Sequence, residues 1–143
     1  NGEVIGVNTA VAEGAEGLGF AIPINEAKPI LDSTQKSGKV IRPYLGVRYT
    51  MLTPQIAREA NLEQSKGAYV SGQEAVVDGS PAEKAGLESG DTIIKVNDLE
   101  LSGSLPLASA VGRFKVGEDV TLVVIRDGEE ITLKAKLAEA PIN

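Results

Sequence analysis

Short stretches rich in β-branched and other apolar residues recur along the chain, a pattern typical of β-strands. Two such stretches lie near the start, at residues 3–10 and 18–24. Others follow from residue 44 onward, at 44–50, 67–71, 75–77, 91–96, 120–126 and 131–137. Asp127-Gly128 separates the last two stretches and is a strong signal for a hairpin turn.

Helix signals fall between these strand-like stretches. Thr53-Pro54 and Ser80-Pro81 each place an N-cap residue before a proline, which predicts short helices over 54–60 and 82–85. The spacing of apolar residues predicts an amphipathic helix over 105–114 and another helix over 26–37. The mixture predicts an α+β fold, a small and partly open barrel or sandwich of about five or six strands capped by two or three helices.

The same pattern divides the chain into three parts. Residues 1–24 are predicted to form a hairpin with a long glycine-containing loop, which needs another sheet because a two-stranded hairpin is marginal in water. Residues 25–43 are predicted to be a linker helix and a basic connector. Residues 44–139 hold the compact set of elements, and we expect them to fold as one domain.

Histidine and cysteine are both absent from the 143 residues, which excludes whole classes of chemistry. Without an imidazole, no Ser-His-Asp or Cys-His arrangement can be built, and zinc sites of imidazole or thiolate are excluded as well. The absence of these two residue types does not exclude catalysis by lysine or carboxylate side chains, but no spacing in the sequence indicates such a site. We therefore expect no catalytic residue, no metal site, no cofactor and no enzymatic activity in this chain.

The net charge of −6 narrows the choice of partners further. A strongly acidic surface repels phosphate backbones, so we expect no nucleic acid partner. No run of about 20 apolar residues is present, so we expect no membrane insertion by this segment. The aspartates at 78, 91, 98 and 127 adjoin turn residues and are interpreted as turn formers rather than as ligands.

Residues 79–97, GSPAEKAGLESGDTIIKVN, closely resemble the central signature of bacterial PDZ domains. Tyr44-Leu45-Gly46-Val47 resembles the carboxylate-binding loop of the HtrA/Deg serine proteases, which carry such domains. The upstream stretches NGEVIGVNTA and GLGFAIPI resemble the last strands of the trypsin-like domain of that family. The resemblance thus covers nearly the whole chain, although the catalytic serine, histidine and aspartate are not matched by any part of it.

Residues 17–20, GLGF, spell the carboxylate loop of animal PDZ domains and offer a competing position for it. A linker and a helix would then separate that loop from the signature that follows. The spacing from Tyr44 suits one small domain better, so we interpret GLGF as a strand of the protease remnant.

The resemblance implies a groove in which an extended peptide adds as a strand and places its carboxylate on main-chain amides. It assigns one wall to Tyr44, Leu45, Gly46, Val47 and Arg48. The opposite wall would be the helix over 105–114, with Ala110 and Arg113 facing the groove. Two alternatives remain open, namely that Arg48 is a solvated surface charge and that Ala110 is a packing residue.

The implied function is capture of apolar C-terminal tails of unfolded or misassembled proteins, in a protein quality-control protease of the bacterial periplasm or cell envelope. The parent's protease domain would be a second partner, fed or regulated by the occupied groove. In the alternative, residues 1–24 pair or swap strands with another chain, and the segment acts in assembly as a homo-oligomer.

Overall fold

The computed structural model describes residues 3–11, 19–25, 27–28, 31, 34, 38 and 41–141. The chain forms two compact units, Asn1–Ile41 and Arg42–Asn143. Each unit is described by itself below.

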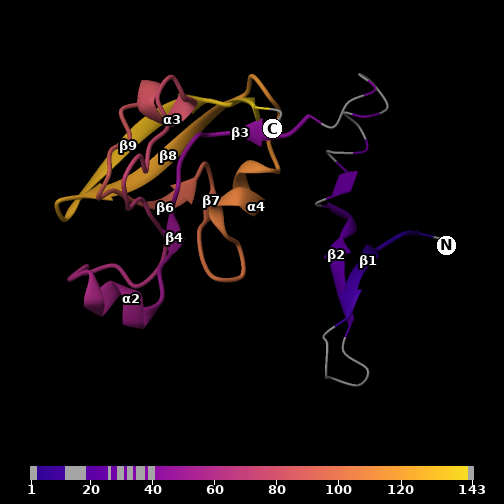
Figure 1. Ribbon diagram of the computed structural model, residues 1–143, viewed down its shortest axis with the longest axis horizontal. Helices are drawn as coiled ribbons and strands as arrows, with labels where there is room; N and C mark the ends of the chain where they lie inside the picture. The colour runs from indigo at the N-terminus through magenta and orange to yellow at the C-terminus, as the bar shows by residue number, and fades with distance from the viewer. Residues whose placement is uncertain are drawn as a thin grey trace. The chain divides into compact units, whose positions relative to one another are not determined.

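The first unit contains a two-stranded antiparallel sheet of β1 (Gly6–Val11) and β2 (Gly19–Pro23) (Figure 1). The pairing shifts between Asn8 and Ala10, which is a β-bulge or a related irregularity. The hairpin strands predicted from the sequence are therefore present. The loop was predicted at 11–17; Val11 belongs to β1, and the rest of that loop lies outside the described residues. Most of the helix predicted at 26–37 also lies outside them, although Ala27, Lys28, Leu31 and Thr34 are described and helical.

The second unit consists mostly of short strands with three short helices among its described residues (Figure 1). Its elements are β3 (Pro43–Tyr44), β4 (Thr50–Met51), α2 (Pro54–Glu59), β5 (Ala68–Tyr69), α3 (Pro81–Lys84), β6 (Thr92–Val96), β7 (Leu99–Glu100), α4 (Leu107–Val111), β8 (Asp119–Arg126), β9 (Glu129–Lys136) and β10 (Ala138–Glu139). The main sheet runs in the order β4-β5-β6-β8-β9, with β7 paired to β6, while β3 pairs with β10. This is the predicted α+β fold, and its sheet does not close into a barrel.

Local sequence signals predict the caps and turns of this unit correctly. The Thr53 hydroxyl accepts a hydrogen bond from the amide of Ile56 at the start of α2, and Ser80 does the same for Glu83 at the start of α3. The turn at Asp127-Gly128 has φ values of 51° and 84°, as a two-residue hairpin of the primed type requires. These features depend only on neighbouring residues, which is why they can be predicted from the sequence.

Three predicted elements differ from the structure. The strand expected over 75–77 is reduced to a single bridge between Val76 and Val47. The strand expected over 44–50 is interrupted, because the chain turns at Leu45–Gly46 and separates β3 from β4. The helix expected over 105–114 is limited to Leu107–Val111, and Gly112 ends it. Leu107 and Val111 are buried as predicted, whereas Phe114 lies beyond the helix and is only half-buried.

One hydrophobic cluster fills the second unit. Its fully buried members include Ile93 and Val96 of β6, Leu122 and Val124 of β8, and Leu137 after β9. Buried side chains alternate with more exposed ones along β8, so one face of the sheet is covered by the helices and loops. Leu87, which follows the turn at Gly86, also lies in the core and is 3% exposed.

A buried ion pair joins two distant parts of this unit. Asp91 is 1% exposed, and its two carboxylate oxygens accept hydrogen bonds from Nε and one terminal nitrogen of Arg126, both at 2.7 Å. Arg126 also donates to Glu88 and to the carbonyl of Gly86. The hydrogen bond to Asp91 raises the pKa of Arg126 above its ordinary value. The sequence suggested only a turn-forming role for Asp91, so this pair was missed.

We predict that Arg126→Leu destabilises the second unit by about 2–4 kcal/mol, because Asp91 stays buried without its cationic partner. All three tyrosines lie in this unit, so urea unfolding followed by tyrosine fluorescence reports on it alone. Glu100→Gln is the control, since it breaks the exposed pair with Lys95 and costs less than about 1 kcal/mol. Equal effects of the two variants would contradict a structural role for the buried pair.

Candidate functional site

The turn between β3 and β4 is held from behind by the start of α3. The carbonyl oxygen of Leu45 accepts a hydrogen bond of 2.8 Å from the amide of Ala82. The carbonyl oxygen of Gly46 accepts one from the amide of Val77 at 3.0 Å and one from the Ser80 hydroxyl at 3.3 Å. Both carbonyls of the turn therefore point toward the segment that leads into α3.

Fixing these carbonyls also fixes the amides that follow them. In a trans peptide the N–H points opposite to the C=O of the same unit, and no described peptide bond is cis. The amides of Gly46 and Val47 are thus directed away from α3. Tyr44 is paired with Ala138 in the ladder of β3 and β10, which orients the amide of Leu45 in the same way. Within the described residues, none of these three amides donates a hydrogen bond.

Gly46 is required at the centre of this turn for two separate reasons. Its φ of +84° lies in the left-handed region that side-chain-bearing residues rarely adopt. A Cβ atom at this position would also collide with the Cβ of Ser80 and lie 2.7 Å from its hydroxyl oxygen. The resemblance placed Gly46 in the carboxylate-binding loop, but the contact with Ser80 was not predicted.

The segment after the turn forms an open edge. Arg48 N donates to the carbonyl of Ala75, and Leu52 N donates to the carbonyl of Gly67, so the backbone groups of the even-numbered residues face the protein. Consecutive residues of a strand direct these groups to opposite sides. Those of Val47 and Tyr49 consequently face outward, and β4 is the end strand of the sheet. A guest strand can pair with this edge.

Helix α4 is tied to the same strand. The amide of Ala108, in the first turn of α4, donates a hydrogen bond of 3.1 Å to the hydroxyl oxygen of Tyr49. Leu107 and Val111 hold the helix in the core. The open edge and α4 are thus linked through one side chain. Tyr49 was not among the predicted site residues, although it lies two positions after Val47 on the same face of the strand.

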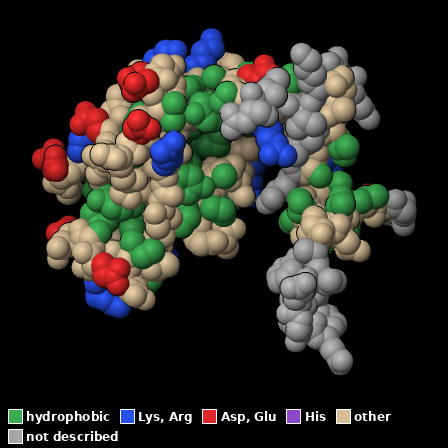
Figure 2. All heavy atoms as spheres, in the orientation of Figure 1, with side chains coloured by type: hydrophobic (Ala, Val, Ile, Leu, Met, Phe, Trp, Pro, Cys, Tyr) green, Lys and Arg blue, Asp and Glu red, His purple; other side chains and the backbone are tan. Residues whose placement is uncertain are grey.

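The predicted site residues differ in how far their side chains are exposed to solvent. The two side chains beside the amides are apolar. Leu45 is 4% exposed, and Val47 is half-buried against the core. Ala110 is fully buried in the core and offers no surface, which agrees with its alternative interpretation as a packing residue. Arg48 and Arg113 are exposed. Charged side chains of both signs are interspersed on the visible face of this unit (Figure 2).

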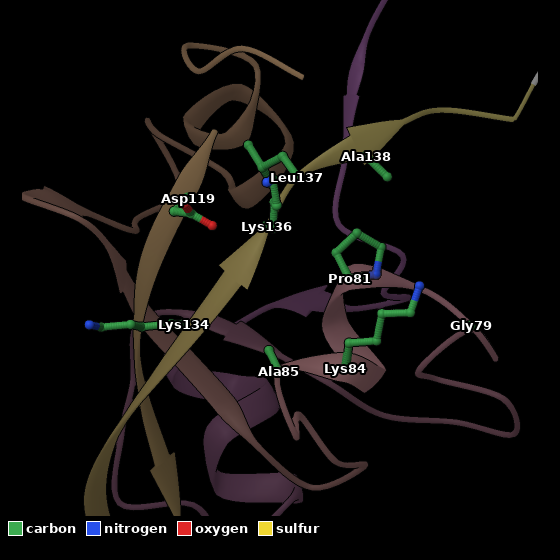
Figure 3. A pocket seen from close by; sticks show the side chains of 9 residues that line it. All are labelled: Gly79, Pro81, Lys84, Ala85, Asp119, Lys134, Lys136, Leu137 and Ala138. Atoms are coloured by element: carbon green, nitrogen blue, oxygen red, sulfur yellow. The ribbon is translucent and has the colours of Figure 1, made fainter. Parts of the chain in front are cut away.

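A second concave feature lies elsewhere, between α3 and the strands β8, β9 and β10 (Figure 3). This pocket has a volume of about 450 Å³. Lys84, Lys134 and Lys136 line it, but the side chains of Lys84 and Lys134 point in different directions (Figure 3). It contains none of the predicted site residues, and its cations do not converge on a common point.

Two further features are absent from the described residues. No group of three or more acidic side chains is arranged there to hold a metal ion. Among the helices that the structure describes, none is long and apolar enough to cross a membrane.

Comparison with known protein families gives a match to the model of the PDZ domain over residues 43–137. The match begins next to the turn at Leu45–Gly46 and includes the open edge, α3 and α4. Residues 17–20, whose GLGF pattern offered a competing position for the carboxylate loop, lie outside it. The family predicted from the signature at 79–97 is confirmed.

Curated relatives of this chain are serine endoproteases. The chain is 38% identical over 99% of its length to a probable periplasmic serine endoprotease DegP-like of Marinomonas sp., and 36% identical over its full length to the periplasmic serine endoprotease DegP of Escherichia coli. It is 40% identical to the serine protease Do-like HtrB of Bacillus subtilis over 97% of its length. The chain spans about 30% of the length of these relatives.

The solved structures that resemble this chain are also HtrA-type proteases. The HtrA-type protease AlgW with a decapeptide superimposes with a TM-score of 0.76 at 34% identity, and covers 99% of this chain with 44% of its own. AlgW with a tripeptide gives a TM-score of 0.71 at 34% identity. The resemblance to HtrA/Deg proteases predicted from the sequence is therefore confirmed.

We predict that Gly46→Ala lowers the stability of the second unit by about 2–4 kcal/mol, because backbone strain adds to the collision with Ser80. Gly117→Ala is the matched control, since Gly117 has a φ of +83° and a Cβ added there would meet no atom within 4 Å. Strain alone then costs about 1 kcal/mol. Urea unfolding measures both values, and equal losses would show that the Ser80 contact is unimportant.

Proposed function

Because the chain belongs to the PDZ domain family, we propose that it is the peptide-binding module of an HtrA-type serine endoprotease. The ligand is the C-terminal tail of another polypeptide, bound as an added strand beside residues 47–51. The observation that carries this proposal is the set of three outward amides at Leu45, Gly46 and Val47, followed directly by a strand edge that pairs with no other described strand.

The amides serve as the site for the ligand's terminal carboxylate. Successive main-chain N–H groups turned to one side form a concavity that binds an anion without a cationic side chain. This suits an acidic protein, in which the nearby Arg48 is exposed and adds only weak, screened attraction. The carboxylate lies where the edge begins, so the ligand strand runs antiparallel to residues 47–51.

The preference for an apolar last residue follows from what borders the amides. Leu45 and Val47 flank Gly46, and both contribute apolar surface to the core or its border. A ligand side chain that enters there leaves water and contacts hydrocarbon. Exposed apolar C-termini mark unfolded or misassembled chains, which connects the groove to protein quality control.

The parent protein is proposed to be a serine endopeptidase outside the cytoplasm, as the names of the relatives suggest. The chain itself has no histidine for a triad, so it binds peptides and cleaves none. An occupied groove either delivers the tail to the protease domain or changes that domain's activity. Either form of coupling requires contacts that differ between the free and bound states.

We predict that a peptide of about ten residues with a free C-terminal valine binds the full chain with a Kd of about 1–100 μM. Amidation of its C-terminus weakens binding at least about tenfold, because the amides lose their anionic partner. Fluorescence anisotropy of N-terminally labelled peptides measures both constants. A change in the ligand is preferable to Leu45→Glu, which would place a charge in the core.

Equal binding of the free and amidated peptides would overturn the carboxylate site. A peptide that ends in aspartate is the matched control for the apolar pocket, and we expect it to bind more weakly than the valine peptide. The purified chain should leave casein intact, and cleavage would contradict the purely binding role.

Assembly through residues 1–24 is the second candidate function. Val7 and Ile22 lie opposite each other in the hairpin, and they are 47% and 42% exposed. Val4 and Ile5 are more exposed still, and hydrophobic side chains are visible on this unit (Figure 2). A two-stranded sheet with an uncovered apolar face favours pairing with a further strand or sheet.

If assembly is a function of the hairpin, the full chain self-associates at about 10–100 μM. The double variant Val7→Lys, Ile22→Glu should then be monomeric, because it places charges on the apolar face. Light scattering after size exclusion measures the mass. Val116→Lys, which changes an exposed apolar residue of the other unit, is the control. A full chain that is monomeric throughout this range removes the assembly role.

A further inference from the structure

Tyr49 supplies a helix cap that the sequence of α4 lacks. The N-cap position of α4 is Pro106, and its side chain makes no capping hydrogen bond. The free amides of a first helical turn need acceptors from elsewhere. The hydroxyl oxygen of Tyr49 accepts the hydrogen bond of Ala108 and fills this role from the edge strand.

The Tyr49 ring is consequently fixed in place. It is half-buried and packs against the core beside Val47 and Met51, which share its side of the strand. Helix α4 spans only five residues, so it has few hydrogen bonds of its own with which to hold its first turn. Displacement of the ring would uncap the helix and expose packed apolar surface. The phenol therefore cannot move aside without cost when a ligand binds.

The register of the added strand places one ligand residue next to this ring. The ligand runs antiparallel, with its carboxylate at the amides of residues 45–47. Side chains on one face of a strand recur every two residues. When the last ligand residue lies beside Val47, the residue two positions earlier lies beside Tyr49.

We infer that Tyr49 determines the selectivity of the groove at the ligand residue two positions before the C-terminus, and that only a small side chain, such as that of glycine, alanine or serine, is accommodated there. The inference rests on the proposed function and deepens it. The ring reaches from the edge strand to the first turn of α4, where its hydroxyl oxygen meets the amide of Ala108, and we expect a larger ligand side chain to clash with it there. Selection therefore arises from exclusion by a fixed side chain, as in other sites that reject ligands by a steric clash.

Two peptides that end in valine and differ only in alanine or leucine two positions earlier test this inference. We expect the wild-type chain to bind the alanine peptide at least about fivefold more tightly. Tyr49→Ala should reduce this ratio below about twofold, because the ring is removed. Tyr49→Phe keeps the ring and should keep the preference, while the lost cap lowers its urea midpoint. Gln73→Ala, at an exposed position outside residues 44–51 and α4, should retain the wild-type ratio.

Equal binding of both peptides by the wild-type chain would overturn the role of Tyr49 and leave the proposed function intact. Retention of the wild-type ratio in Tyr49→Ala would do the same. If Tyr49→Ala does not fold, Tyr49→Leu keeps apolar packing but cannot reach α4, and it should show the reduced ratio. Binding of neither peptide below about 1 mM would instead overturn the proposed function itself.

Discussion

The hydrogen bonds that hold the carbonyls of Leu45 and Gly46 determine what this surface can do. Their donors are the amides of Val77 and Ala82 and the hydroxyl of Ser80, all at or next to the start of α3. Because a trans peptide unit points its C=O and N–H in opposite directions, anchoring the carbonyls inward turns the amides outward. The proposed carboxylate site thus depends on backbone geometry and uses no cationic side chain.

The same segment is secured at its other end by a salt bridge. Asp91 closes the turn that follows α3, and Arg126 of β8 binds Asp91, Glu88 and the carbonyl of Gly86 together. The segment from Ser80 to Asp91 is therefore fixed to the turn at one end and to the central sheet at the other. A rigid support of this kind keeps the three amides preorganised, which reduces the ordering cost of binding.

The parts of the fold that could be predicted are those whose interacting residues lie close together in the sequence. The caps at Thr53 and Ser80 and the hairpin turn at Asp127-Gly128 involve partners within a few positions. The break in the expected strand at 44–50 and the pair of Asp91 with Arg126 involve partners more than 30 positions away. The position of the proposed groove could be predicted from the resemblance to PDZ domains. The contact of Tyr49 with α4 could not, because no sequence pattern encodes the proximity of the edge strand and that helix.

Hydrogen bonds from main-chain donors support the turn. The orientation of its amides therefore does not depend on the apolar side chains that border them. Backbone amides persist whatever side chains occupy positions 45 and 47, provided that Gly46 and Ser80 remain. Substitutions at positions 45 and 47 would therefore alter the apolar surroundings of the proposed carboxylate site while its amides stay in place. Under the proposed function, the preference for the last ligand residue can thus change while the binding of its terminal carboxylate is kept.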